Sequence, residues 1–246
     1  MHQAIPNGQA HAKSKASYLC PMHHPLQNPV YNALVSGDRQ LSHGNGNVRF
    51  FDEEVSPFAG FDHGYEKGFS DLYDQLPARR KILYAIPLPI TGPGGWEIRH
   101  EIKGLQFLYK GAGIEAEFPT IKPLTTTHVD EMVQLAALTK PGPFATRTID
   151  FGSYFGIFDS GKLVAMTGQR LHVESFTEIS AVCTHPDHTG KGYAFTLLQH
   201  QLQLILQQGQ RPFLHVREDN ERAINLYERM GFVVSRPMHF YFMKRQ

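Results

Sequence analysis

The sequence predicts an α/β protein of the α+β type, in which a mixed and mostly antiparallel sheet is flanked by helices. Short segments rich in β-branched and aromatic residues alternate with helix-like segments through the second half of the chain. Their order is several strands, a long helix, a strand, a second helix and two strands, which fits one sheet with helices on its faces. The chain has 246 residues, of which 41% are apolar, enough for one large domain or two modest ones.

Turn and cap signals delimit the elements of the second half. Pro and Gly in 140–144 stop its first helix, Asp159-Ser160-Gly161 forms a hairpin turn, and Gly209 and Gly231 end the two later helices. The expected strands are 119–125, 154–171 (two strands around the turn), 177–186, 212–216, 232–235 and 239–244, and the expected helices are 127–139, 191–208 and 220–232.

The first half carries weaker signals that predict a second, smaller α/β unit. Residues 28–35 and 68–80 are helix-like, and 48–55 and 81–90 are extended. We therefore expect three parts: a poorly ordered arm over 1–25, an amino-terminal α/β region of unknown role over 26–117, and the main domain over 118–246. A degenerate copy of the second half is an open alternative for the middle part.

Composition excludes several classes of protein. The 24 Lys and Arg against 23 Asp and Glu give a formal net charge of +1, so no nucleic-acid partner is expected. No segment is apolar over the length of a membrane span. Cys20 and Cys183 are the two cysteines, too few for a disulfide framework. Cys20, His23 and His24 are close in sequence but lack a partner cluster, so no metal site is expected. We expect a cytoplasmic protein.

The segment Ala181–Ala194, AVCTHPDHTGKGYA, is the most informative. A β-branched strand runs into a glycine-bearing turn and then directly into a long helix. Amide groups at the start of a helix bind anions, and Gly190 and Gly192 let the backbone approach a ligand closely. Lys191 adds a cation. This geometry suits a pyrophosphate, although a plain helix start has the same signature.

Together with FLHVREDNERAINLYERMGF about thirty residues later, this segment resembles the GNAT superfamily of acetyl-CoA-dependent N-acetyltransferases, over roughly residues 121–246. The resemblance implies the GNAT acyltransferase fold and acetyl-CoA as co-substrate. The family signature is Arg or Gln, two variable residues, Gly, one variable residue, then Gly or Ala. Thr189 departs from its first position, so one phosphate contact is expected to be weaker.

The resemblance also implies roles for individual residues. The family's phosphate cradle corresponds to Thr189, Gly190, Lys191, Gly192, Tyr193 and Ala194. Main-chain groups of Val182, Cys183 and Thr184 would hold the pantetheine arm, which lies along this strand like an added strand. Asn220 matches a residue that contacts the same arm, and it could equally cap the next helix.

Acetyl transfer needs a neutral amine, and neutralising a lysine-like ammonium at pH 7 costs about 4 to 5 kcal/mol. Glu178, at the start of the cofactor strand, is the leading candidate for the general base. His215, His185 and His172 are its rivals. Tyr227 matches the family tyrosine that protonates the departing CoA thiolate, and a core tyrosine is the alternative reading.

These residues predict an enzyme that transfers the acetyl group from acetyl-CoA to a primary amine by direct attack in a ternary complex. A catalytically silent acyl-CoA-binding or sensing module is the alternative. The acceptor, a small molecule or a protein amine, cannot be read from the sequence, nor can the oligomeric state. Phe144 and Arg147, in the loop after the first helix of the main domain, either contact the acceptor or pack on the surface.

Overall fold

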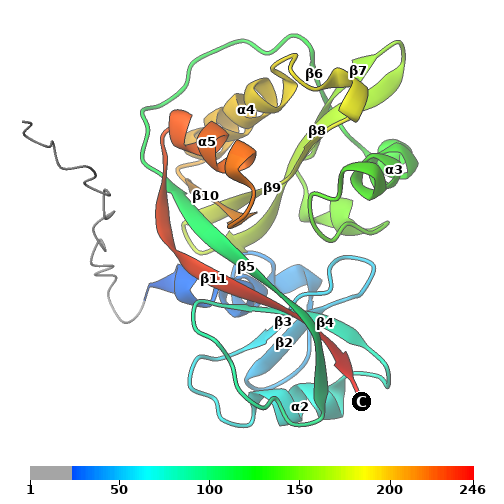
Figure 1. Ribbon diagram of the computed structural model, residues 1–246, viewed down its shortest axis with the longest axis vertical. Coiled ribbons are helices and arrows are strands. Elements are labelled where there is room, and N and C mark those ends of the chain that lie inside the picture. Colours follow the sequence, from blue (N-terminus) through cyan, green and yellow to red (C-terminus); the bar gives the residue numbers. More distant parts are fainter. Residues whose placement is uncertain (1–23) are drawn as a thin grey trace, which may run out of the picture.

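The computed structural model describes residues 24–246, and an eight-stranded sheet runs through its centre (Figure 1). The strand order is β4-β11-β5-β10-β9-β8-β7-β6. Every neighbouring pair is antiparallel except β9 with β10, so the predicted mixed and mostly antiparallel sheet is confirmed. The strands are β4 Lys81–Ile86, β5 Trp96–Tyr109, β6 Ile121–Pro123, β7 Phe155–Asp159, β8 Lys162–Val173, β9 Phe176–Thr184, β10 Arg211–Arg217 and β11 Phe232–Arg245.

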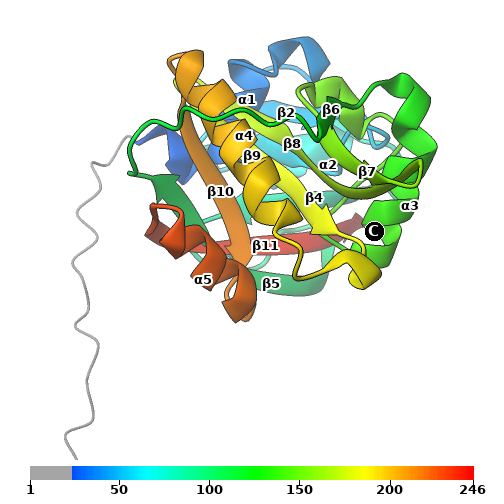
Figure 2. The ribbon, with the colours of Figure 1, turned by 90° about the horizontal axis from the view of Figure 1, so that it is seen from above.

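Helices cover both faces of the sheet (Figure 2). On one face lie α4 (Tyr193–Gln207) and α5 (Glu221–Arg229), and their apolar side chains share a core cluster with β5, β9 and β10. On the other face, α1 (Pro29–Val35) and α3 (Val129–Thr139) form a second cluster with β8 and β9. Both clusters are needed, because strands that are buried on both faces must pack apolar side chains in two directions.

The amphipathic pattern of α4 explains how it sits on the sheet. Leu198, Leu202 and Ile205 recur at helical spacing and are fully buried, as the sequence predicts. Ala194, expected on the same face, is only half-buried because it lies in the first turn. The buried stripe fixes the direction of the helix, and with it the position of its amino terminus.

The amino-terminal segment folds against the main sheet. It contains a three-stranded sheet in the order β1-β2-β3, the helices α1 and α2, and two short 3-10 turns. The additional elements are β1 Ser42–His43, β2 Val48–Phe51, β3 Ala59–Phe61, α2 Gly68–Gln75 and the 3-10 turns Pro25–Gln27, Arg39–Leu41, Thr126–His128, Thr148–Phe151 and Pro186–His188, the last three of which lie in the second half.

The expected boundary near residue 117 does not separate two sheets. β4 and β5 precede it in sequence, yet both pair with β11 at the end of the chain, and β5 also pairs with β10. Four strands of the main sheet, β4, β5, β10 and β11, are therefore held together by contacts that cross the expected boundary.

Two strands of the main sheet differ from the sequence-based expectation. β5 was not predicted at all, and the two expected last strands form one, β11. A register shift between Val234 and Arg236 accommodates the break that the sequence shows there, so the chain bends without leaving the sheet.

The turn between β7 and β8 confirms its sequence signal. Ser160 and Gly161 both have positive φ, 50° and 78°, between the paired residues Asp159 and Lys162. Positive φ at both central residues is the type I′ arrangement whose twist suits a hairpin.

The expected arm falls almost entirely on residues 1–23, outside the described part of the chain. His24, which is described, accepts a hydrogen bond from the Leu26 amide through Nδ1. No helix within residues 24–246 is long and apolar enough to cross a membrane.

Candidate cofactor and catalytic site

The parallel strands β9 and β10 separate part-way along their length. They pair at three positions, the last of which joins Phe213 to Glu178, while β9 continues to Thr184 with β8 on its other side. A register shift in the β8–β9 ladder and a φ of 52° at Ala181 mark a bulge at the point of separation. The backbone of residues 179–184 therefore faces β10 without a strand partner there, which is the arrangement that receives an added extended chain.

Val182, Cys183 and Thr184 lie on this unpaired part of β9. The side chains of Val182 and Cys183 point to opposite faces of the sheet, because Val182 packs in the cluster under α4 and α5 and Cys183 in the cluster under α3. A ligand in the gap would meet their main-chain groups rather than these side chains.

The glycine turn leads directly from the end of β9 to α4. Gly190 and Gly192 have φ of 83° and 80°, a region that favours glycine, and a Cβ at either position would meet no atom within 4 Å. The space beside both residues is therefore open. The first amides of α4, from Tyr193 onward, have no acceptor within the helix and can bind an anion.

Side chains of the same turn are tied to one another. The Thr189 hydroxyl donates to the Pro186 carbonyl at 3.0 Å, so it is already used within the turn. Lys191 Nζ lies 3.2 Å from His188 Nδ1 and 3.8 Å from Asp159 Oδ2. Lys191 is thus held beside the turn, and Asp159 partly offsets its charge.

Asn220 and Tyr227 are placed by α5. The Asn220 side chain accepts a hydrogen bond from the Ala223 amide at 3.2 Å and caps the helix. Tyr227 is 7% exposed and packs edge-on against Phe107 and Phe232. Burial raises the pKa of its hydroxyl to about 12, so the hydroxyl stays protonated and can donate a hydrogen bond.

Glu178 lies fully buried within a network of charged and polar side chains. Arg170 Nε and Nη2 donate to its two carboxylate oxygens at 2.8 and 2.7 Å, and His215 Nδ1 lies 2.8 Å from Oε1. Burial alone would raise the pKa of Glu178, but the positive charge and hydrogen bonds of Arg170, with the hydrogen bond from His215, outweigh it and hold the pKa well below its usual range.

Gln106 selects the tautomer of the neutral His215 ring. Its amide nitrogen donates to the Leu26 carbonyl at 3.0 Å and lies 3.1 Å from His215 Nε2. Because the carbonyl can only accept, the Gln106 nitrogen must face it, and the same nitrogen then donates to Nε2. The neutral ring of His215 therefore carries its proton on Nδ1, toward Glu178.

The expectation that Glu178 is the general base stays a prediction, and the surroundings of its carboxylate do not favour it. Its carboxylate accepts three hydrogen bonds and is stabilised in the ionised form, so it is a weak proton acceptor. His215 is engaged at both ring nitrogens and its side chain is 5% exposed. Neither group is positioned to take a proton from an acceptor without breaking the network.

The remaining histidine candidates lie elsewhere. His172 Nδ1 is 2.6 Å from the Asp38 carboxylate, which joins β8 to the segment after α1. His185 caps the 3-10 turn before Thr189 by accepting from the Asp187 amide. His172 thus serves an amino-terminal contact, and His185 lies by the glycine turn.

The thiol of Cys183 is poorly suited to nucleophilic attack. The residue is 7% exposed, and burial raises the pKa of its thiol to about 11. The hydroxyl of Thr139, at the end of α3, contacts this thiol. Cys183 therefore packs as a small buried side chain.

The loop after α3 is anchored to the amino-terminal segment. Arg147 pairs with both Asp52 and Asp150 at 3.0 Å, and its amide donates to the Glu54 carbonyl. Phe144 packs edge-on against Tyr154. These contacts favour a packed loop for Arg147, whereas Phe144 also lines a large cavity, described below.

The sequence-based reasoning missed Arg170 and Gln106. A regular hairpin around Glu174 would place Leu171 opposite Glu178. The register shift between Gln169 and His172 brings Arg170 to Glu178 instead, so the sequence pattern did not point to Arg170. Gln106 lies on the unpredicted β5, so no sequence signal pointed to it. Among the described residues, no group of three or more His, Cys, Asp or Glu side chains is arranged to hold a metal ion.

Comparisons with known proteins agree with this architecture. The family model described as FR47-like protein matches residues 154–241. A GNAT-family protein from Novosphingobium aromaticivorans is 32% identical, with 91% of this chain and all of that chain covered and a TM-score of 0.86. The separated strands β9 and β10 and the glycine turn of α4 lie on a mixed, mostly antiparallel sheet. The chain belongs to the GNAT family.

More distant structures share the fold alone. A GCN5-related N-acetyltransferase from Kribbella flavida is 15% identical, with 88% of this chain and 95% of that chain covered and a TM-score of 0.56. A Drosophila protein is 13% identical, with 89% of each chain covered and a TM-score of 0.62. No curated protein matches the sequence.

Proposed function

We propose that this protein transfers an acetyl group from acetyl-CoA to a primary amine. The observation that carries the proposal is the separation of β9 from β10 beside the glycine turn of α4. An extended pantetheine arm would pair with the free backbone of residues 179–184, and the pyrophosphate would lie on the amides from Gly190 to Ala194. The residues proposed to hold the pantetheine arm and the pyrophosphate thus belong to one continuous stretch of chain.

Direct attack in a ternary complex is the proposed route. The amine nitrogen forms a bond to the thioester carbonyl, the carbon–sulfur bond breaks, and CoA leaves as a thiolate that takes up a proton. A covalent acetyl-enzyme would need a reactive thiolate, and burial of Cys183 opposes one. Holding both substrates in place supplies much of the rate.

Tyr227 is proposed to donate a hydrogen bond, and then a proton, to the departing sulfur. Its hydroxyl stays protonated because burial raises its pKa to about 12. A hydrogen bond to charge that develops only in the transition state accelerates the reaction rather than substrate binding.

We assign Glu178 a positioning role in this scheme. With Arg170 and His215 it joins β8, β9 and β10 just where β10 leaves β9. The network therefore fixes the point at which β9 and β10 separate. The proton of the acceptor amine leaves by another route, such as bound water.

A catalytically silent acyl-CoA-binding module is the second candidate, and one observation favours it. Both groups expected to act as base, Glu178 and His215, are already fully hydrogen-bonded. Such a module would bind acyl-CoA through the glycine turn but would not transfer the acyl group.

The test measures thiol release from acetyl-CoA against a panel of primary amines, with Tyr227→Phe as the variant. We expect turnover with at least one amine and a fall in kcat of about 10- to 100-fold in the variant, with little change in KM for acetyl-CoA. Tyr84→Phe is the matched control, because Tyr84 is equally buried but lies on β4 in a separate core cluster. Saturable acetyl-CoA binding without turnover on any amine would favour the silent module.

A further inference from the structure

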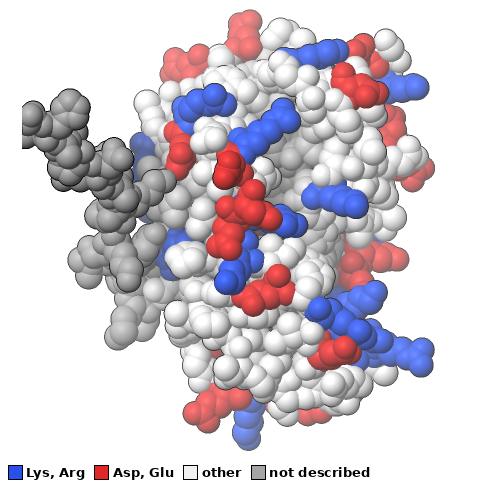
Figure 3. Space-filling model, viewed as in Figure 1, with Lys and Arg blue, Asp and Glu red and all other residues white. Residues whose placement is uncertain are grey.

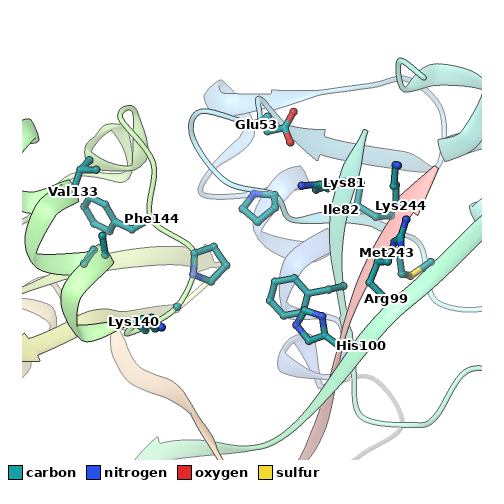
Figure 4. A pocket seen from close by; sticks show the side chains of 16 residues that line it. Glu53, Lys81, Ile82, Arg99, His100, Val133, Lys140, Phe144, Met243 and Lys244 are labelled. Atoms are coloured by element: carbon teal, nitrogen blue, oxygen red, sulfur yellow. The ribbon is translucent and has the colours of Figure 1, made fainter. Parts of the chain in front are cut away.

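A large cavity lies between α3 and the far end of the main sheet (Figure 4). Its volume is about 850 Å³. One wall consists of α3 and the loop that follows it, and the other consists of β4, β5 and β11 with the segment around Pro57. In Figure 4, Val133, Lys140 and Phe144 lie on the first wall, facing Lys81, His100 and Lys244 on the second. This volume suits a whole small molecule.

The lining is mainly apolar. His100 and Phe242 stack with ring centroids 4.3 Å apart and 12° between their planes, which gives the strand wall a flat aromatic surface. The apolar lining residues of the two walls include Pro57, Ile82, Val133, Ala136, Phe144 and Phe242. Such a lining binds the apolar body of a ligand and leaves orientation to the few charged groups at its edge.

The charged side chains around the cavity are mostly basic. Lys81, Lys140, Lys244 and Arg99 line it, with Glu53 as the one acidic residue among its lining residues. Glu53 lies 3.6 Å from Arg80, and Arg99 lies 3.0 Å from Glu97. Within residues 24–246, none of the three lysines has a carboxylate oxygen within 4.0 Å. Acidic and basic side chains are otherwise interspersed on the face seen in Figure 3.

Two of these lysines occupy an unfavourable position. Lys81 on β4 and Lys244 on β11 are directly opposite partners in the antiparallel ladder. Like charges at opposite positions destabilise a strand pair. Glu97, the partner of Lys244 on the other side, is paired with Arg99 instead. An anion bound at the cavity edge would relieve the repulsion between Lys81 and Lys244.

The cavity adjoins the proposed transfer site through α3. Ala136 and Lys140 line the cavity, while Thr139 on the same turn contacts the Cys183 thiol on the cofactor strand. The Cβ position of Gly142, another lining residue, is 4.0 Å from Arg170 Nη1. A molecule in the cavity therefore lies beside the strand on which the acetyl group is expected.

We propose that this cavity binds the acceptor amine, and that the acceptor carries a carboxylate on an apolar body. The apolar body lies against the Phe242 wall, the carboxylate lies at Lys81 and Lys244, and the amine points toward β9. That the bound molecule is the acceptor rests on the proposed function. The binding preference for a carboxylate can be measured without turnover.

The experiment compares ligand pairs that differ only by the carboxylate. Phenylalanine is compared with phenethylamine, and leucine with 3-methylbutylamine, in thiol release from acetyl-CoA. Binding of the N-acetyl derivatives of all four is measured by calorimetry on the full chain. We expect the carboxylate member of at least one pair to bind about tenfold more tightly, as for one charge-assisted contact.

The double variant Lys81→Gln/Lys244→Gln should lose this preference. The control double variant Lys103→Gln/Lys162→Gln makes the same change in net charge at exposed lysines that do not line the cavity, and it should keep the preference. Equal or weaker binding of both carboxylate members, or a preference that survives in the Lys81/Lys244 variant, would overturn the proposal. Preferential binding without turnover would instead support the cavity assignment and count against acetyl transfer.

Discussion

Arg170 and Glu178 form a two-bond ion pair across the β8–β9 hairpin, with nitrogen–oxygen distances of 2.8 and 2.7 Å. The glutamate is fully buried and the arginine side chain is 12% exposed. Arg170 also lies over the ring of Phe58, 4.9 Å from its centroid, so the pair connects β9 to the amino-terminal segment. Removing either partner leaves an uncompensated charge in the core.

The first prediction concerns the stability of this pair. Glu178→Gln should lower the free energy of unfolding by about 3 to 5 kcal/mol, because Arg170 keeps its charge and loses its counter-ion. Chemical denaturation of Arg170→Met, Glu178→Gln and the double variant forms a mutant cycle. The loss in the double variant should be smaller than the sum of the two single losses by more than about 1 kcal/mol. Additive losses would show that the pair contributes no coupling.

A second prediction follows from the lowered pKa of Glu178. The unfolded chain binds a proton at this group near pH 4.5, whereas the folded protein does so only at lower pH. The stabilisation by ionised Glu178 is thus fully present above about pH 5 and is lost as the pH falls toward the folded-state pKa. The difference in unfolding free energy between the wild type and Glu178→Gln should be constant from pH 8 to 6 and shrink below pH 4.5. A difference that grows on acidification would contradict this account.

A third prediction separates the binding role of the glycine turn from its conformation. Gly192 and Gly161 have φ of 80° and 78°, and a Cβ at either would meet no atom within 4 Å. Each change to Ala should therefore cost roughly 1 to 2 kcal/mol of stability from the left-handed conformation. Only Gly192→Ala should also weaken acetyl-CoA binding in calorimetry, by about tenfold, because its methyl group faces the proposed phosphate site. Equal affinity for acetyl-CoA in the two variants would show that the glycine turn at Gly192 does not take part in cofactor binding.

A fourth prediction concerns the route of transfer. In a Cys20→Ser background, fewer than about one in a thousand Cys183 thiols should be ionised at pH 7.5, since burial raises the pKa to about 11. Iodoacetamide should modify the folded protein far more slowly than the urea-unfolded protein. Intact-mass measurement after incubation with acetyl-CoA alone should show no acetylated enzyme. Rapid alkylation of Cys183, or an acetyl adduct on it, would contradict direct attack and indicate a covalent acetyl-enzyme intermediate.

The parts of the fold that could be predicted are those whose own residues carry a strong pattern. The helices α4 and α5 have clear apolar stripes and caps, and the hairpin at Ser160-Gly161 has a turn sequence that requires positive φ. The first half of β5 has a charged residue at every second position from Glu97 to Lys103 and is mostly exposed after Trp96, and its partners β10 and β11 lie a hundred or more residues later. Pairing at such separation leaves no local pattern.

The site shows the same limit. Asn220 and Tyr227 could be placed on one helix from their spacing, and the structure has both on α5 or at its cap. The role of Glu178 could not be judged, because a buried carboxylate serves as a base or as half of an ion pair according to its neighbours. Those neighbours, Arg170 and His215, come from the strands on either side, and only the assembled sheet brings them together.

Hydrogen–deuterium exchange with and without acetyl-CoA tests the central claim most directly, because it reports where the cofactor binds. The account predicts slower exchange in peptides that cover residues 179–184 and 189–196, since the cofactor would occupy the backbone amides of β9 and of the glycine turn. The hairpin around Gly161 serves as an internal reference and should not change. Unchanged exchange in both segments at saturating acetyl-CoA, or protection confined to other parts of the chain, would contradict the proposed site.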